Sequence, residues 1–515
     1  MLVIRLRKRD FAFHWLVAVL GTLAAWSLTL VSYSFLPAEI TLLKWQLPDY
    51  LITSGLIFDQ ITWIYMLATM TLLLSALLTS AARSGDPDLP RPAWDVLSAA
   101  LLFTAVLLLA IASGDILFLL ITWTIISLFE IALWLVHLDG QPKNERLGFD
   151  FALRFVSLGC LIWALVLSLS RDLALDINSL GKEITPVLIL GVALRLGIFP
   201  PFRNPTETIA LPNITESVLR LSIFAPGLTL LTRVSGNAIE PSLRTLFFVL
   251  ACIAALYAGF NWMSGPEDRT NLSSWSIGAG AFCLTAAASA QPVASMAWGI
   301  TLLLAGGFIF HFKVRPVWLR PALFICILAL TSLPLTPTSA GALSYDPIRW
   351  FVPILLLSQS LLVSGFLLSG IQPGPILVGP ERWVWALYVL GLAVLPASLY
   401  FLAWFGFENF STAPGSRLGI DKISRLLPGF FVVSISILGI YLVRNRSATV
   451  ARAALILKTI FGFHWVYQIS RQLIRPVMGI FIIANRMLEG QAGILWAFLL
   501  LVLFISLVTE SLVGG

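Results

Sequence analysis

Apolar runs, each about 20 residues long, follow one another along nearly the whole of this 515-residue chain. A helix that spans a bilayer needs about that length, and inside lipid every backbone polar group must be bonded within the protein. Because 58% of the residues are hydrophobic and only 11% are charged, these runs must face lipid or one another. The sequence therefore predicts an all-α polytopic membrane protein with about 14–15 transmembrane helices and without strands.

The predicted spans are 11–31, 56–80, 94–112, 115–138, 151–170, 184–201, 214–232, 243–263, 272–289, 293–311, 317–333, 350–370, 381–405, 426–443 and 491–513. The segment near 458–490 mixes basic and aromatic residues with apolar ones, which favours a helix lying in the interface or along a neighbouring subunit. The alternative is an ordinary helix kinked at Pro476. The polar connections between spans are too short to fold as separate domains.

Two of the spans carry pairs of prolines that should interrupt them. Pro200 and Pro201 follow an apolar run with Arg195 in it, and Pro334 and Pro337 interrupt a second run. An arginine at bilayer depth costs at least ~2.5 kcal/mol, and intramembrane charges usually mark a pathway, an ion pair or a gate. Interrupted spans in two halves of a chain indicate a transporter built from repeats, with its pathway near the breaks.

The charge pattern excludes some classes of protein. The net charge is +7, but the basic residues are spread over short loops and the N-terminus, as the positive-inside rule describes, so we expect no nucleic-acid partner. The basic N-terminus followed by the run at 11–31 favours an uncleaved first helix with its basic end in the cytoplasm. The four cysteines lie in separate apolar runs, so neither a metal nor another cofactor is expected: Cys160, Cys252, Cys283 and Cys326.

Several short motifs occur in an order that resembles one membrane protein family. The motifs are Phe58-Asp59, Asp115 to Trp123, Ala193 to Pro200, Glu267 to Ile277 and Leu304 to Gly307. Together with the paired broken helices, they resemble the antiporter-like membrane subunits of respiratory NADH–quinone oxidoreductase (complex I), membrane hydrogenases and Mrp-type cation/proton antiporters. Related subunits also occur in inorganic-carbon uptake complexes. The resemblance covers roughly residues 50 to 345.

The resemblance implies a domain organisation. The family fold has a core of about fourteen helices with two inverted five-helix repeats, each containing one broken helix. We therefore expect N-terminal transmembrane helices at 1–112, a first repeat at 113–263 with its broken helix near 188–205, a second repeat at 264–405 with its broken helix near 325–341, and C-terminal helices at 406–515.

The proton-carrying residues of the family are largely replaced in this sequence. Family members use a glutamate, several lysines and a histidine; the glutamate corresponds to Thr124, and the nearest acid, Glu130, lies on a different helix face. The lysine of the first broken helix corresponds to Arg195 and the histidine after it to Phe202. Arginine stays protonated, so it can hold a carboxylate or repel cations but cannot pass on a proton. Three further family positions fall on residues that do not titrate: Ala225, Ser295 and Gly299.

Six charged residues remain candidates for an ion pathway or gate: Asp115, Glu130, Arg195, Glu216, Arg220 and Arg269. If Glu130 pairs with Arg195, the two form a fixed electrostatic latch; the alternative is that Arg195 snorkels or bonds unwound carbonyls at the prolines. Glu216 and Arg220 are four residues apart on one predicted helix. They either form an ion pair with each other or line the pathway. His311, at a span end, is expected at the membrane interface rather than in a relay.

The sequence thus favours an antiporter-like subunit of a multi-subunit ion-translocating or respiratory complex in a bacterial plasma membrane. Its partners would be other membrane subunits, the lipid bilayer, and protons or sodium, with translocation either retained or degenerate. It would be a non-catalytic membrane subunit of an NADH–quinone oxidoreductase-like complex. The alternative is a non-conducting docking subunit that anchors a partner protein. A membrane enzyme acting on lipid-linked substrates is disfavoured, because the sequence has no HExxH motif or clustered Cys and His residues.

Overall fold

The structure is a computed structural model of the 515-residue chain. It describes residues 11–46, 51–80, 94–137, 144–171, 173, 175–201, 213–235, 239–264, 272–312, 319–345, 350–371, 381–406, 423–444 and 472. The segment predicted near 458–490, apart from residue 472, and the span predicted at 491–513 lie outside these residues, as does Arg269.

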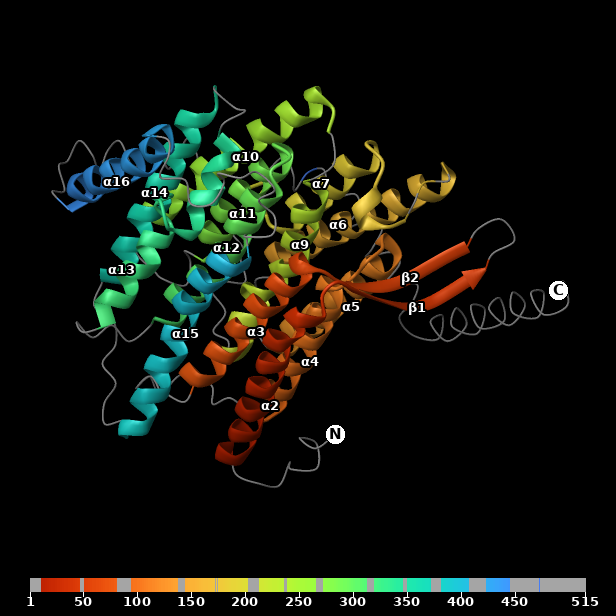
Figure 1. The fold of residues 1–515 in the computed structure, drawn as a ribbon, viewed down its shortest axis with the longest axis horizontal. Helices are drawn as coiled ribbons and strands as arrows, with labels where there is room; N and C mark the ends of the chain where they lie inside the picture. The colour runs from red at the N-terminus through yellow and green to blue at the C-terminus, as the bar shows by residue number, and fades with distance from the viewer. Residues whose placement is uncertain are drawn as a thin grey trace, which may run out of the picture.

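The described chain is a bundle of helices (Figure 1). The α-helices are α2 (Phe11–Val31), α3 (Gln60–Ser80), α4 (Trp94–Ile111), α5 (Ile116–His137), α6 (Asn144–Ser170), α7 (Ile184–Arg195), α8 (Asn213–Arg220), α9 (Ala225–Val234), α10 (Pro241–Ser264), α11 (Leu272–Ala288), α12 (Pro292–His311), α13 (Arg320–Ala329), α14 (Val352–Ile371), α15 (Arg382–Gly406) and α16 (Ile423–Arg444). Nine helices in the described ranges are long and apolar enough to cross a bilayer. The predicted all-α polytopic fold is confirmed.

A two-stranded antiparallel hairpin lies between α2 and α3, and the prediction of a chain without strands is wrong here. Strands β1 (Ala38–Gln46) and β2 (Leu51–Phe58) pair with Ala38 opposite Phe58, and the hairpin extends from one end of the bundle (Figure 1). The predicted span at 56–80 began inside β2, because only Asp59 and Gln60 separate the apolar end of β2 from the apolar residues of α3. The short 3₁₀ helix η2 (Ile177–Ser179) lies near the same end, since Asp115 and Asp176 form an isolated bridge.

Three described segments form the centre of the bundle. Within each of α3, 216–234 and α12, 94% of the span is buried inside the protein, against 22% for the span beginning in α2 and 33% for that in α6. The sequence of α3 is apolar on every side, which is typical of a helix surrounded by others. Figure 1 shows α3, α9 and α12 within the bundle and α16 at its edge. The core of the bundle is therefore built on α3, the segment 216–234 and α12, while α5 and α6 lie nearer its surface.

Both predicted helix breaks are present. After α7 ends at Arg195, the chain turns through Gly197, whose φ of +69° is a left-handed conformation that glycine adopts without strain, and then passes through Pro200 and Pro201. After α13 ends at Ala329, Pro334 lies in a turn, and Pro337 begins the 3₁₀ helix η7 (Pro337–Tyr345). Proline lacks a backbone donor and clashes with the preceding turn, so neither helix can continue past these positions.

Candidate functional site

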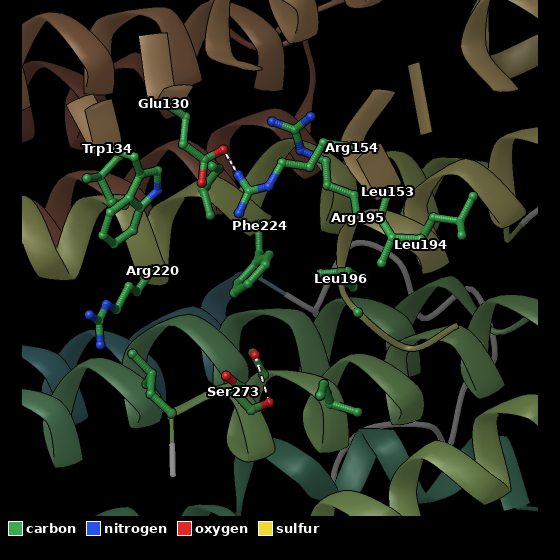
Figure 2. Close-up of a pocket in the computed structure, with 16 residues that line it drawn as sticks. Glu130, Trp134, Leu153, Arg154, Leu194, Arg195, Leu196, Arg220, Phe224 and Ser273 are labelled. Carbon is green, nitrogen blue, oxygen red and sulfur yellow. Dashed lines mark hydrogen bonds and ion pairs between the residues drawn. The ribbon is translucent and has the colours of Figure 1, made fainter. Parts of the chain in front are cut away.

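A pocket lined by charged side chains lies beside the first helix break (Figure 2). It is small, with about 60 Å³ that the centre of a water-sized molecule can occupy, and it has an open mouth. Helix α5 contributes Glu130 and Trp134, α6 contributes Arg154, and Arg195 and Arg220 come from the ends of α7 and α8. The ends of α7 and α8 thus lie at the same pocket. Three guanidinium groups and one carboxylate therefore line the pocket among the described residues.

Arg195 is held by α5. Its side chain is buried, Nη1 donates a hydrogen bond to Ser127 Oγ at 3.1 Å, and the guanidinium carbon lies 4.9 Å from the centre of the Trp123 ring. A cation over an indole face is attracted to the ring's negative quadrupole, by an amount that grows when water is excluded. The side chain of Arg195 is thus held between α7 and α5 by these two contacts.

Glu130 forms its ion pair with Arg154, from the next helix, and the expected pair with Arg195 is corrected accordingly (Figure 2). Glu130 is only 1% exposed, so its charge needs a close partner. Glu130 pairs with Arg154 and not with Arg195 because of where Glu130 lies along α5. Arg195 reaches Ser127 and Trp123, one and two turns before Glu130, whereas α6 places Arg154 directly against the carboxylate.

Sequence reasoning missed Arg154 altogether. The residue lies four positions inside the predicted span at 151–170, and a charge within an apolar span was the available signal. It was overlooked because it stands close enough to the start of the span to pass as an interfacial residue. Its buried contact with Glu130 shows that it belongs to the pocket.

Glu216 and Arg220 satisfy each other on α8, as one of the two interpretations of the sequence predicted. Glu216 Oε1 and Arg220 Nη1 are 3.1 Å apart, and the two side chains are 0% and 6% exposed. The helix places residues four apart on the same face, so the pair forms within one element. Arg220 also lines the pocket, which connects this pair to the group formed by Glu130, Arg154 and Arg195.

His311 is buried, contrary to its expected place at the membrane interface. Its Nδ1 lies 2.9 Å from Ser75 Oγ and its Nε2 lies 2.6 Å from Ser217 Oγ, while its backbone carbonyl accepts a hydrogen bond from Tyr388. The end of α12 meets α3, α8 and α15 at this point, and a position at the end of an apolar run does not reveal such lateral cover. The contact with Ser217 joins the end of α12 to α8, the helix that also carries the Glu216–Arg220 ion pair.

Asp115 lies far from the pocket and caps α5. Its Oδ1 accepts a hydrogen bond from the Phe118 backbone at 2.7 Å, and its Oδ2 accepts from Ser54 Oγ and the Gly55 backbone, both at 2.9 Å. An aspartate at this position satisfies a donor that the helix start leaves open. About 22 Å of α5 separates Asp115 from Glu130, so Asp115 anchors the hairpin to α5.

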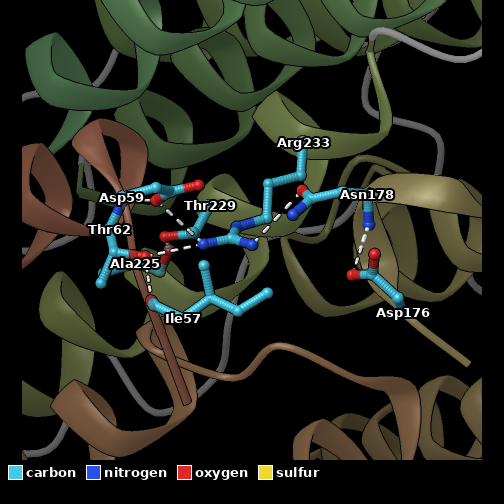
Figure 3. Close-up of polar contacts among 8 residues, drawn as sticks. All are labelled: Ile57, Asp59, Thr62, Asp176, Asn178, Ala225, Thr229 and Arg233. Atoms are coloured by element: carbon cyan, nitrogen blue, oxygen red, sulfur yellow. Dashed lines mark hydrogen bonds and ion pairs between the residues drawn. The ribbon is translucent and has the colours of Figure 1, made fainter. Parts of the chain in front are cut away.

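Another buried arginine, Arg233, joins three elements near the hairpin (Figure 3). Arg233 Nη2 donates to Asp59 Oδ1 at 3.0 Å and to Thr62 Oγ1 at 2.7 Å, and its Nη1 donates to Asn178 Oδ1 at 3.4 Å. Asp59 also accepts from the Thr62 backbone at the start of α3. Arg233 thus ties the end of α9 to the start of α3 and to η2.

The second helix break is bonded by neutral side chains. Thr338 Oγ1 donates to the Ala329 carbonyl at 2.7 Å and accepts from the Ser332 backbone at 2.9 Å. Gln359 of α14 donates to the Leu330 carbonyl at 2.7 Å and to Ser332 Oγ at 2.8 Å. Backbone groups freed inside a membrane protein must be bonded by other protein groups, and here a hydroxyl and an amide do so.

No three His, Cys, Asp or Glu side chains gather into a possible metal site among the residues that the structure describes. The four cysteines are free thiols in the described ranges.

Comparisons with known proteins identify the fold. No family model matches the sequence, and no curated protein matches it. Among solved structures, a chain of the Mrp complex from Dietzia sp. DQ12-45-1b matches 100% of this chain with a TM-score of 0.69 and 15% identity. A chain of the archaeal membrane-bound sulfane sulfur reductase, a respiratory membrane complex, matches 98% with a TM-score of 0.63 and 14% identity. The chain has the antiporter-like fold.

Respiratory complex I from Thermus thermophilus with bound NADH supplies a third match, over 75% of this chain, with a TM-score of 0.54 and 17% identity. This chain spans 63% of the matched Mrp chain, 97% of the sulfane sulfur reductase chain and 93% of the complex I chain. The resemblance predicted from the motifs and the broken helices is confirmed at the level of the antiporter-like fold. At these identities the similarity concerns the fold alone.

Proposed function

We propose that this chain is an antiporter-like membrane subunit of a multi-subunit complex in a bacterial plasma membrane, in which the first broken helix carries a fixed charge cluster instead of a proton relay. The match to chains of three multi-subunit membrane complexes supports the subunit role. We also propose the two five-helix repeats at 113–263 and 264–405, each with the broken helix that the structure contains near 195 and near 330.

The observation that carries the proposal is the pairing around the first break. A relay needs groups that gain and lose protons at modest cost, and a guanidinium keeps its proton. Arg195 is bonded to Ser127 and stacked on Trp123, and the two buried glutamates are each in an ion pair with an arginine. Charges held in this way stabilise one geometry and oppose the passage of cations, which is the behaviour of an electrostatic lock.

The docking alternative is favoured by the second break. Its described freed backbone groups are bonded by Thr338 and Gln359, which are neutral and do not titrate. A subunit with a locked first break and a neutral second break would serve the complex by its shape and surface. In this version no ion passes through the chain, and its role is to hold partner subunits in the membrane.

The test is the charge-matched double variant Glu130→Gln/Arg154→Gln in the complex purified from native membrane and reconstituted in vesicles. The double variant removes one positive and one negative charge together and keeps the size of the glutamate. We expect the same co-purifying subunits and a proton or sodium flux within about twofold of wild type, because a fixed ion pair does not carry the ion. A flux reduced tenfold or more, with assembly intact, would show that the pair takes part in translocation. If the wild-type chain purifies from native membrane without other subunits, the proposed role as a subunit of a complex is contradicted.

A further inference from the structure

A line of polar side chains follows α3 through the centre of the bundle. Near the hairpin, Thr62 accepts a hydrogen bond from the buried arginine at the end of α9, and the Tyr65 hydroxyl lies 2.9 Å from Thr232 Oγ1 of the same helix. Toward the other end of α3, Ser75 Oγ lies 2.9 Å from Nδ1 of His311 on α12. About 15 Å of helix separates Tyr65 from Ser75. Polar groups inside a membrane bundle mark the route that water or an ion would follow.

The ring of Tyr65 interrupts this line by packing against the backbone of α12. Tyr65 is 0% exposed, and a Cβ atom at Gly299 would overlap its hydroxyl oxygen and lie 3.0 Å from two of its ring carbons. Leu72, two turns further along the same face of α3, packs in the same way, because a Cβ atom at Gly307 would overlap its Cδ1. Glycine at these two positions of α12 therefore lets side chains of α3 fill the space between the two helices.

The hydroxyl of Tyr65 does not continue the line as a proton path. Thr232 Oγ1 donates to the Leu228 carbonyl at 3.0 Å within α9, so its own hydrogen is already used and the Tyr65 hydroxyl is the donor to Thr232. A carbonyl oxygen only accepts hydrogen bonds. The series of bonds from Tyr65 therefore ends at the backbone of α9, which has no proton to pass on.

We propose that Tyr65 is a plug that keeps water out of the centre of the bundle: its ring closes the space between α3, α9 and α12, Gly299 gives it room, and the bond to Thr232 holds it there. The inference rests on the proposed function and deepens it, because it names the side chain that interrupts the polar line. Tyr65 is not among the described residues that line the pocket at the first break, so the plug and the charge cluster are tested separately.

Cys283 of α11 serves as a built-in reporter, because it is 0% exposed and lies near the Tyr65 hydroxyl. The test labels the purified full-length chain in nanodiscs with a small water-soluble methanethiosulfonate and follows each cysteine by mass spectrometry. Removing the Tyr65 ring leaves a cavity, and the Thr232 hydroxyl gives it a polar wall, so water should fill it. We expect Tyr65→Ala to raise the labelling rate of Cys283 by about tenfold or more, since the thiolate is the reactive form and water is needed to produce it. Cys326 of α13, also 0% exposed, is the internal control and should label as in wild type.

Three further variants separate the plug from a general loosening of the fold. Tyr65→Phe keeps the ring and removes only the hydroxyl, so Cys283 should label at the wild-type rate. Tyr388→Ala makes the same truncation at another buried tyrosine, on α15, and should also leave that rate unchanged. Tyr65→Leu introduces a good helix former that is smaller than the ring, and its rate should lie between those of wild type and Tyr65→Ala.

Labelling of Cys283 at the wild-type rate in both Tyr65→Ala and Tyr65→Leu would overturn the inference, as would fast labelling in Tyr65→Phe. If Tyr65→Ala unfolds, Cys283 and Cys326 label together, and Tyr65→Leu then decides. The labelling needs neither partner subunits nor flux, so its failure leaves the flux test of the proposed function intact. Fast labelling in Tyr65→Ala together with a flux that depends on the Glu130–Arg154 pair would instead contradict the proposed function alone.

Discussion

The two helix breaks solve the same problem with different chemistry. Each exposes backbone groups within the bundle and each is followed by a pair of prolines, but the first is surrounded by buried charges and the second by a hydroxyl and an amide. Ion pairs in a protein interior hold a geometry strongly only while both partners remain, whereas neutral hydrogen bonds cost less to lose. The comparison teaches that a repeated backbone design need not carry a repeated function.

The largest effect is expected from breaking the buried ion pair at the first break. Arg154→Ala leaves the Glu130 carboxylate buried without its partner, and should lower the free energy of unfolding by about 3–5 kcal/mol. Unfolding in mixed detergent micelles measures this change. The matched control is Glu130→Gln/Arg154→Gln, which leaves no uncompensated charge and should recover most of the loss. Equal destabilisation by both variants would show that packing, rather than charge, is responsible.

A smaller effect is expected at the second break. Gln359→Leu removes both hydrogen bonds of the amide and leaves the Leu330 carbonyl and Ser332 hydroxyl without that donor, which should cost about 1–3 kcal/mol. The same unfolding experiment measures it. A loss as large as that of Arg154→Ala would remove the energetic difference between the two breaks. Gln359→Glu, which keeps the shape but adds a buried charge, should be worse than Gln359→Leu.

Arg195→Lys tests whether the first break depends on the guanidinium itself. Lysine keeps the charge but loses the planar group that donates to Ser127 and stacks on Trp123, so we expect a loss of about 1 kcal/mol. Lysine can release a proton where arginine does not, so proton flux in the reconstituted complex is the second measurement. A gain of flux would sharpen the comparison by showing that arginine keeps the break closed. Unchanged stability and unchanged flux would show that any cationic side chain can take the place of the guanidinium at the first break.

The smallest effect is expected for Ser127→Ala. The hydroxyl accepts one hydrogen bond from Arg195 and donates one to the Trp123 carbonyl of its own helix, and its loss should cost about 0.5–1.5 kcal/mol. Thr124→Ala, which removes a hydroxyl bonded only to its own helix in the described contacts, is the control and should cost less. If the two variants are equivalent, the contact between Arg195 and Ser127 contributes nothing to the first break.

Local features of the sequence predicted the breaks but not the partners. Pro200 and Pro334 end their helices by an effect within a few residues, so the sequence alone suffices. The choice of Arg154 over Arg195 by Glu130 depends on how α5, α6 and α7 pack, which no spacing in the sequence encodes. His311 shows the same limit, because the position of a residue along a helix is readable but its lateral position in the bundle is not.

The sequence did not predict the hairpin, for a different reason. Only Asp59 and Gln60 separate the apolar residues of β2 from those of α3, so the apolar residues on both sides resemble a single span. Asp59 marks the change, because it accepts a hydrogen bond from the Thr62 backbone and thereby starts the helix. Short apolar runs do not distinguish strand from helix by periodicity alone.

The hydrogen bonds at the hairpin end join the starts of α3 and α5 and the end of α9 into one plate, through Asp115 and through Arg233 with Asp59. Helices are stiff along their axes, so a tilt of the plate must reappear at the opposite ends of α5 and α9, where Trp134 and Phe224 stand in the pocket wall. A force applied to the hairpin outside the bundle would therefore be transmitted along α5 and α9 to the pocket wall.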